Sequence, residues 1–129
     1  MAVQMNAVMI AVEDLARSRT FYADGLGCEV GQDYPAFVSL DLGEGSSSLA
    51  LYEREAAAQD AGVSSAGSGF RGVSFHYLVD STDVVDEVLR LAEAAGGEVV
   101  RKAEASPWGG YFGYFADPDG YLWKVASSA

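Results

Sequence analysis

The sequence predicts an α+β fold made of two βαβββ modules, and three observations support this prediction. The order strand, helix, three strands occurs twice along the 129 residues. A Gly-, Ser- and Ala-rich segment at residues 61–69 separates the two copies. Half of the residues are apolar and 12% are aromatic, which allows a hydrophobic core and excludes intrinsic disorder. We expect a single domain, residues 1–129, in which the modules form a curved eight-stranded mixed sheet with helices on the outer face.

Module one is predicted to span residues 1–53. Apolar and β-branched runs predict its strands at residues 3–12, 28–33, 37–42 and 47–53. Glu13-Asp14 caps the predicted helix, residues 15–23, and Gly25 and Gly27 end it. Gly43-Glu44-Gly45 forms the hairpin turn between the last two strands. The linker is placed at residues 54–70, with one helical turn at 54–59.

Module two is predicted to span residues 71–129, with strands at 72–79, 98–102, 111–116 and 121–126. Asp80 or Ser81 caps its helix, which runs to about residue 95 and ends at Gly96-Gly97. The apolar stripe of this helix is predicted to be Val84, Val85, Val88, Leu91, Ala92 and Ala95. Asp117-Pro118-Asp119-Gly120 has the composition of a tight turn and precedes the final strand.

The chain is strongly acidic, with 8 Lys and Arg residues against 19 Asp and Glu residues and a formal net charge of −11. Such a surface repels phosphate backbones, which argues against nucleic acid as a partner and favours neutral or cationic ligands; keeping the protein in solution is the alternative role. Cys28 is the only cysteine, which excludes an intramolecular disulfide and a Cys-rich zinc site. We expect no signal peptide, no membrane segment and a cytoplasmic location.

Several segments together carry a resemblance to a known family. They are Val12-Glu13-Asp14-Leu15 with Phe21-Tyr22, Leu26-Gly27-Cys28, Trp108-Gly109-Gly110-Tyr111, and Phe115 through Asp117-Pro118-Asp119-Gly120 to Trp123. With the repeated βαβββ order, they resemble the vicinal oxygen chelate superfamily, which includes glyoxalase I, bleomycin-resistance proteins, fosfomycin-resistance thiol transferases and extradiol dioxygenases. The pattern is most similar to a glyoxalase-like branch without assigned substrate. The resemblance implies a concave ligand cavity and a homodimer.

The resemblance also implies where a divalent metal would be held, because metal-using members supply four His or Glu ligands. These positions fall on Ala7, Ala50, Ser74 and Lys124. Alanine has no donor atom, a serine hydroxyl is a weak ligand, and a lysine ammonium repels a cation. Strand alternation also places these residues on the face away from the helices. We therefore expect no metal and no cofactor.

The candidate ligand-binding residues are polar or aromatic side chains expected to line the cavity. They are Phe37, Ser39, Tyr52, Ser74, His76, Trp108, Tyr111 and Lys124. His76, the only histidine, is interpreted as a hydrogen-bonding residue or a general base. Trp108 and Tyr111 are interpreted as a stacking surface, or as packing between modules. Lys124 either binds an anionic group of a ligand, pairs with a carboxylate, or extends to the rim.

Three functions remain open at this point. The first is a non-catalytic protein that binds a small aromatic or cationic molecule in a metal-free cavity, as drug-binding antibiotic-resistance members of the family do. The second is a metal-dependent lyase or dioxygenase of the glyoxalase type, which the four substituted positions oppose. The third is a metal-independent enzyme that uses His76 or Lys124. The sequence favours the first, without catalysis.

Overall fold

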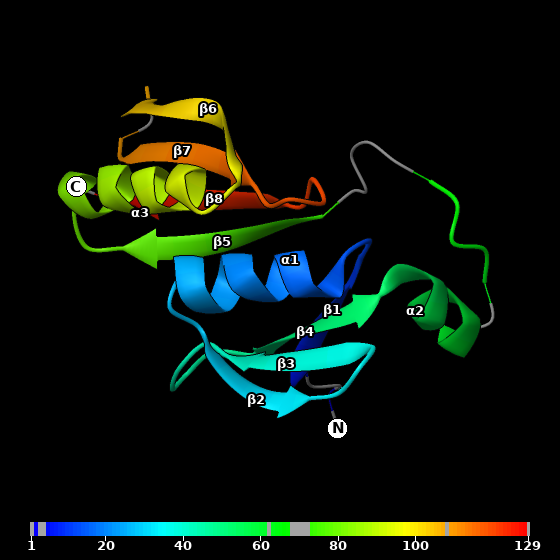
Figure 1. The fold of residues 1–129 in the computed structure, drawn as a ribbon. Coiled ribbons are helices and arrows are strands. Elements are labelled where there is room, and N and C mark those ends of the chain that lie inside the picture. The colour runs from blue at the N-terminus through cyan, green and yellow to red at the C-terminus, as the bar shows by residue number, and fades with distance from the viewer. Residues whose placement is uncertain (1, 3–4, 62, 68–72, 108, 129) are drawn as a thin grey trace. The chain divides into compact units, whose positions relative to one another are not determined.

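The computed structural model describes residues 2, 5–61, 63–67, 73–107 and 109–128. Backbone contacts divide the chain into two compact units, Met1–Gly67 and Ser68–Ala129. Each unit contains one βαβββ module, so the predicted α+β fold of two modules is confirmed (Figure 1). Hydrogen bonds join the strands of each module into a four-stranded mixed sheet, with the orders β1-β4-β3-β2 and β5-β8-β7-β6. In the described ranges, the boundaries of the strands agree with the predicted ones to within a few residues, while residues 3, 4 and 72 of the predicted strands lie outside the described residues.

The first unit contains β1 (Ala7–Val12), α1 (Leu15–Arg19), the π-helix η1 (Thr20–Gly25), β2 (Glu29–Asp33), β3 (Phe37–Asp41), β4 (Ser48–Glu53) and α2 (Arg54–Ala61). The second unit contains β5 (Ser74–Val79), α3 (Thr82–Ala94), β6 (Glu98–Ala105), β7 (Tyr111–Ala116) and β8 (Leu122–Ser127). In both units the first strand pairs parallel with the last strand, and the remaining pairs are antiparallel. The two modules therefore share one topology.

Helix α1 packs against β4 and β3 of the first sheet. Alternate strand residues form the buried side of this sheet. They are Ile10 and Val12 of β1, Val38 and Leu40 of β3, and Leu49 and Leu51 of β4, each at most 3% exposed. Asp14 caps the helix, as predicted, because its Oδ1 accepts a hydrogen bond from the Arg17 backbone N at 3.1 Å.

The predicted helix at 15–23 does not remain α-helical. From Thr20 it continues as a π-helix, in which the Leu26 backbone N donates to the Phe21 carbonyl five residues earlier, at 3.0 Å. Phe21 and Tyr22 are adjacent in sequence, yet both are only 1% exposed, and their rings meet edge to face at 4.9 Å. Gly27, with φ of 76°, then ends the helix in the left-handed conformation that favours glycine.

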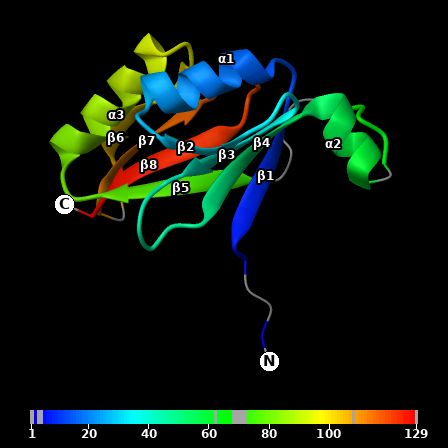
Figure 2. The same cartoon turned by 60° about the horizontal axis from the view of Figure 1, so that its bottom comes forward.

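Helix α2 replaces the single helical turn predicted at the start of the linker. It contacts the neighbouring strands β1 and β4 (Figure 2). At its start, the Arg54 guanidinium donates to the carbonyl of Ser65 at 2.7 Å and to that of Gly67 at 2.9 Å. Arg54 thereby holds the segment that follows α2 close to the beginning of the helix.

Helix α3 packs against β7, β6 and β8 of the second sheet. Ser81 caps it, since its Oγ accepts a hydrogen bond from the Val84 backbone N at 3.3 Å. The buried residues are Val85, Leu89 and Ala92. The predicted stripe was therefore wrong in omitting Leu89 and in including Val84 and Leu91, which are 39% and 37% exposed. No helix in the described ranges is long and apolar enough to cross a membrane.

Strand β6 is longer than predicted and irregular. Its pairing with β7 shifts between Val99 and Arg101 and again between Arg101 and Glu104. Each shift inserts an extra residue into β6, as in a β-bulge, and a bulge changes the face to which the following side chains point. Gly113 of β7 lies beside these irregularities. A Cβ there would lie 2.7 Å from Leu89 Cδ1 of α3 and 2.9 Å from the Arg101 carbonyl oxygen.

Gly113→Ala is therefore expected to destabilise the protein by about 1–3 kcal/mol, because the added methyl group would have to displace both α3 and the backbone of β6. Urea unfolding measures the effect. Gly31→Ala is the matched control, since its Cβ would meet chiefly the Ser39 hydroxyl, a side chain that can rotate. Equal losses of unfolding free energy in the two variants would show that the close contacts around Gly113 do not set the cost of the added methyl group.

Candidate functional site

Each sheet has an open face, which we define as the face opposite the helix α1 or α3 of the same unit. In the first sheet, Phe37 pairs with Tyr52 and Ser39 pairs with Ala50, and all four lie on the open face. The rings of Phe37 and Tyr52 meet edge to face at 5.5 Å. The Ser39 Oγ accepts a hydrogen bond from the Gln32 backbone N at 2.8 Å. Three of the predicted ligand-binding residues therefore share one half-buried patch.

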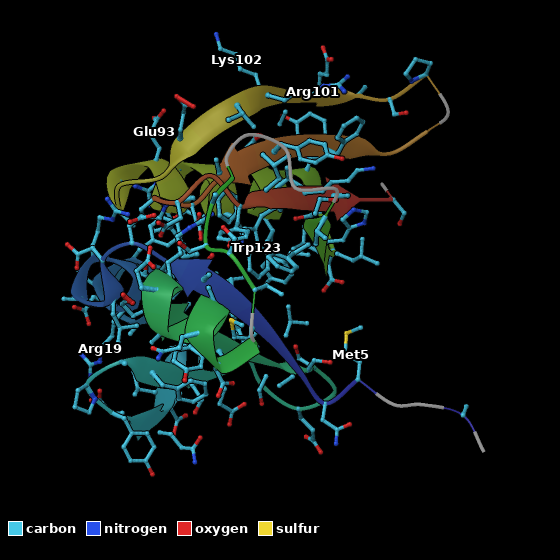
Figure 3. All side chains as sticks on the ribbon, turned by 90° about the vertical axis from the view of Figure 1, so that its right-hand side faces the viewer. Met5, Arg19, Glu93, Arg101, Lys102 and Trp123 are labelled. Carbon is cyan, nitrogen blue, oxygen red and sulfur yellow. The ribbon has the colours of Figure 1, made fainter. Side chains whose placement is uncertain are left out.

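On the open face of the second sheet, one residue from each strand forms a transverse row. His76 of β5 pairs with Lys124 of β8, Lys124 pairs with Tyr114 of β7, and Tyr114 pairs with Arg101 of β6. We call these four residues the basic row. Figure 3 labels Arg101 beside Lys102 on β6, and Trp123, which belongs to the other face of the sheet, on β8. The basic row gathers three nitrogen-bearing side chains and a phenol, all of which can donate hydrogen bonds.

The two permanent cations of the basic row share one aromatic ring. Lys124 Nζ lies 4.5 Å from the centre of the Phe112 ring, and Arg101 Cζ lies 4.7 Å from it. Phe112 also meets Tyr114 edge to face at 6.1 Å. Arg101 forms an ion pair with Glu104 at 3.2 Å. Within the described ranges, no carboxylate lies within 4.0 Å of Lys124 Nζ, so the carboxylate pairing considered from the sequence is not found there.

Ser74 and His76 are next to each other on the same face. The Ser74 Oγ and the His76 Nε2 are 3.1 Å apart, a hydrogen bond whose direction depends on the tautomer of the ring. Ser74 is half-buried and His76 is exposed. This contact fixes one nitrogen of the imidazole and leaves the ring beside Lys124.

Tyr111 is not part of this group. It pairs with Ser127 and lies on the same face of β7 as Gly113, towards α3. Its hydroxyl donates to Asp86 Oδ1 of α3 at 2.7 Å. That hydrogen bond, burial, and the charges of Asp86 and Asp83 raise the pKa of Tyr111. The structure therefore separates Tyr111 from the other candidates, while Trp108 lies outside the described residues.

The residues at the family's metal-ligand positions do not fit a divalent cation. Ala7 and Ala50 share the open face of the first sheet but carry no donor atom. In the second sheet the Ser74 hydroxyl is bonded to His76, and the Lys124 ammonium lies over Phe112. Among the residues that the structure describes, no three His, Cys, Asp or Glu side chains gather closely enough to hold a metal ion.

A depression of about 480 Å³ lies at the carboxyl ends of β5 and β8. Its lining residues are Leu78, Val79, Gly109, Gly110, Ala126, Ser127 and Ser128. Leu78 pairs with Ala126, and Ala126 pairs with Phe112, so two of the lining residues belong to the same transverse row of strand residues as Phe112.

Sequence reasoning missed Arg101, Phe112 and Tyr114. The signal for the two aromatic residues was present, because the tight turn at 117–120 fixes which residues of β7 and β8 oppose each other. Counting back from Ala116 and Leu122 places Tyr114 opposite Lys124. The face on which Arg101 lies could not be predicted in this way, because it depends on the bulge at Val100.

The family model described as Glyoxalase/Bleomycin resistance protein/Dioxygenase superfamily matches residues 4–125. Among solved structures, a glyoxalase-related enzyme from Fulvimarina pelagi is 29% identical, with a TM-score of 0.87, covering 96% of this chain and 87% of the other.

Two further structures are similar in fold. A glyoxalase/bleomycin resistance protein/dioxygenase family enzyme from Burkholderia phytofirmans is 20% identical, with a TM-score of 0.80 and coverage of 98% and 100%. A lactoylglutathione lyase from Agrobacterium tumefaciens is 23% identical, with a TM-score of 0.73 and coverage of 98% and 95%. A comparison with curated proteins gives no significant match.

Tyr111→Phe is expected to weaken the attachment of α3 to β7 and to leave ligand binding unchanged. Because the pKa of Tyr111 is raised in the folded state, the stability from its hydrogen bond is present below the ordinary tyrosine pKa of about 10 and is lost as the pH rises through the raised value. Urea unfolding should separate wild type from the variant at pH 7, and the difference should shrink in strong alkali. If Tyr111→Phe instead weakens ligand binding, Tyr111 takes part in the binding site, as first predicted from the sequence.

Proposed function

This chain belongs to the Glyoxalase/Bleomycin resistance protein/Dioxygenase superfamily, and on that premise we propose that it binds a small aromatic molecule on the open face of a sheet, without a divalent metal and without catalysis. The single observation that carries the proposal is the lack of metal-binding donor atoms at the four expected ligand positions, Ala7, Ala50, Ser74 and Lys124. Two of these side chains have no donor atom, and the lysine is itself a cation. A ligand on these faces would be held by protein groups alone.

Aromatic side chains on both open faces support a planar ligand. Phe37 and Tyr52 form one edge-to-face pair, and Phe112 and Tyr114 form another. Half-buried rings offer both stacking and edge contacts. In the second sheet, Ala126, the pairing partner of Phe112, lines a depression of about 480 Å³. Burial of ring area contributes roughly 25 cal/mol per Å² before the cost of ordering the ligand. Apolar contact would therefore supply most of the affinity. Ser39 on the first sheet, or Ser74 and His76 on the second, would orient a ligand bound to that sheet through hydrogen bonds.

The homodimer, the cytoplasmic location and a role in antibiotic resistance remain predictions from the sequence. The metal-dependent lyase or dioxygenase remains the alternative function, since one structurally similar protein is named a lactoylglutathione lyase. The two functions differ in one measurable property, which is whether ligand binding needs a metal.

Protein purified without chelator is expected to contain far less than one Ni, Zn, Fe or Mn per chain by elemental analysis. A library of small aromatic compounds, screened by thermal shift, is expected to give ligands whose affinity does not change in excess EDTA. The reason is that no donor set at the four positions holds a metal that could mediate the contact.

The control is a structurally similar metal-binding member of the superfamily, carried through the same purification and screen. Near-stoichiometric metal in this chain, with ligand binding that EDTA abolishes and added metal restores, would contradict the proposal and favour the lyase or dioxygenase. A screen that yields no ligand at all would also contradict it.

A further inference from the structure

We infer that the ligand of this protein carries an anionic group, a carboxylate on a planar ring, and that the basic row on the second sheet binds that group. This inference rests on the proposed function and specifies the class of its ligand. It runs against the charge of the whole chain, which is −11 and favours cations. The local charge of the open face of the second sheet differs from the net charge because Lys124 and Arg101 both lie on it.

The open face of β5, β8 and β7 carries no carboxylate along the described lengths of these strands. Pair registers assign to this face Ser74, His76 and Leu78 of β5, Leu122, Lys124 and Ala126 of β8, and Phe112, Tyr114 and Ala116 of β7. The acidic side chains of this face, Glu98 and Glu104, stand on the edge strand β6. The centre of the face is therefore positive in a chain that is otherwise strongly acidic.

Lys124 is the main binding group in this inference. It is half-buried on the central strand β8, and its ammonium lies over the Phe112 ring without a carboxylate within ion-pair distance in the described ranges. A ring face stabilises a cation less than a carboxylate does. An incoming carboxylate would thus gain a charge-assisted hydrogen bond that no neighbouring side chain supplies.

Arg101 is the second binding group, and its position depends on the bulge in β6. Without the extra residue at Val100, strand alternation would turn Arg101 towards α3. With this extra residue, the Arg101 guanidinium lies over the Phe112 ring, as the Lys124 ammonium does, with Cζ 4.7 Å from the ring centre. Glu104 partly neutralises Arg101 at 3.2 Å, so Arg101 should contribute less than Lys124.

The remaining members of the row complete a site for a ring that bears an anion. His76 and Tyr114 flank Lys124 on either side and can each donate a hydrogen bond. Ala126, which lines the depression together with Leu78, pairs with Phe112, and the apolar ring of a ligand would lie in this depression. Cations at one end and an apolar hollow at the other match an aryl carboxylate better than an aryl cation.

Three probes of one shape test the inference: 2-naphthoate, 2-naphthamide and 2-naphthamidinium, which are anionic, neutral and cationic. Each is titrated into ¹⁵N-labelled full-length protein at low salt, and amide shifts are followed. We expect 2-naphthoate to bind at least about tenfold more tightly than 2-naphthamide and to shift the amides of His76, Tyr114 and Lys124. Its affinity should fall with added salt.

Four variants separate the charge from the fold. Lys124→Met should weaken 2-naphthoate about tenfold or more and leave 2-naphthamide unchanged, and Arg101→Met should have a smaller effect in the same direction. Lys102→Met is the matched control, since it removes one cation from the next position of β6, an exposed side chain, and should change nothing. Glu104→Gln should strengthen 2-naphthoate severalfold, because it frees Arg101 and removes a repelling charge. A gain of affinity cannot come from misfolding.

The outcomes distinguish this inference from the proposed function. Tighter binding of 2-naphthamide or 2-naphthamidinium than of 2-naphthoate would overturn the anion assignment and leave metal-free binding of aromatic molecules intact. Equal losses for Lys102→Met and Lys124→Met would also overturn it, since they would reflect net charge alone. The absence of shifts on the second sheet with all three probes at millimolar concentration would overturn it as well. Metal dependence of ligand binding would instead contradict the proposed function.

Discussion

In each unit one face of the four-stranded sheet packs against a helix, α1 or α3, and many features of both units follow from this constraint. Strand residues alternate between the two faces of a sheet. On the face that packs against α1 or α3, close packing requires apolar side chains of a suitable size, such as Leu51 and Val125, both 0% exposed. The same alternation fixes every second residue on the opposite face. Within each unit these residues are released from packing against a helix, and they are free to carry polar and charged groups. The repeat of the module provides two such faces in one chain.

Much of this arrangement could be predicted from the sequence because it depends on local chemistry. Strand alternation correctly separated Val38 from Ser39, and Asp14 and Gly27 marked the ends of a helix through capping and left-handed φ. The failures share a different cause. Leu89 is buried because it meets Gly113 on a strand distant in sequence, and no periodicity within α3 reveals which of its apolar residues finds that partner.

The candidate site was predicted less completely than the fold for the same reason. Ser74, His76 and Lys124 come together because a parallel pair of strands aligns them, and their common face could be inferred from alternation alone. Tyr111 was grouped with them because it stands beside a glycine-rich loop, whereas the register of β7 against β8, which the turn at 117–120 fixes, places it on the opposite face. The bulge at Val100 was harder to predict from the sequence. It has no sequence signature, yet it decides that Arg101 rather than Val100 extends the row of residues across the sheet.

Lys124 stands where the family resemblance implies a metal ligand, so the proposed metal-free binding and the proposed anionic ligand both depend on this residue. A divalent ion held by carboxylates and histidines provides a positive centre to which the oxygens of a bound molecule are attracted. Replacement of one ligand by lysine removes a donor and at the same time places a permanent positive charge on the same face. Arg101 adds a second positive charge beside the same phenylalanine ring. A protein with this face retains an attraction for negatively charged oxygens, but the attraction now comes from hydrogen-bond donors with fixed direction rather than from an exchangeable ion. Under the proposed function, such a face would bind and orient an anionic ring compound through protein groups alone, without a Lewis acid to polarise the compound for reaction.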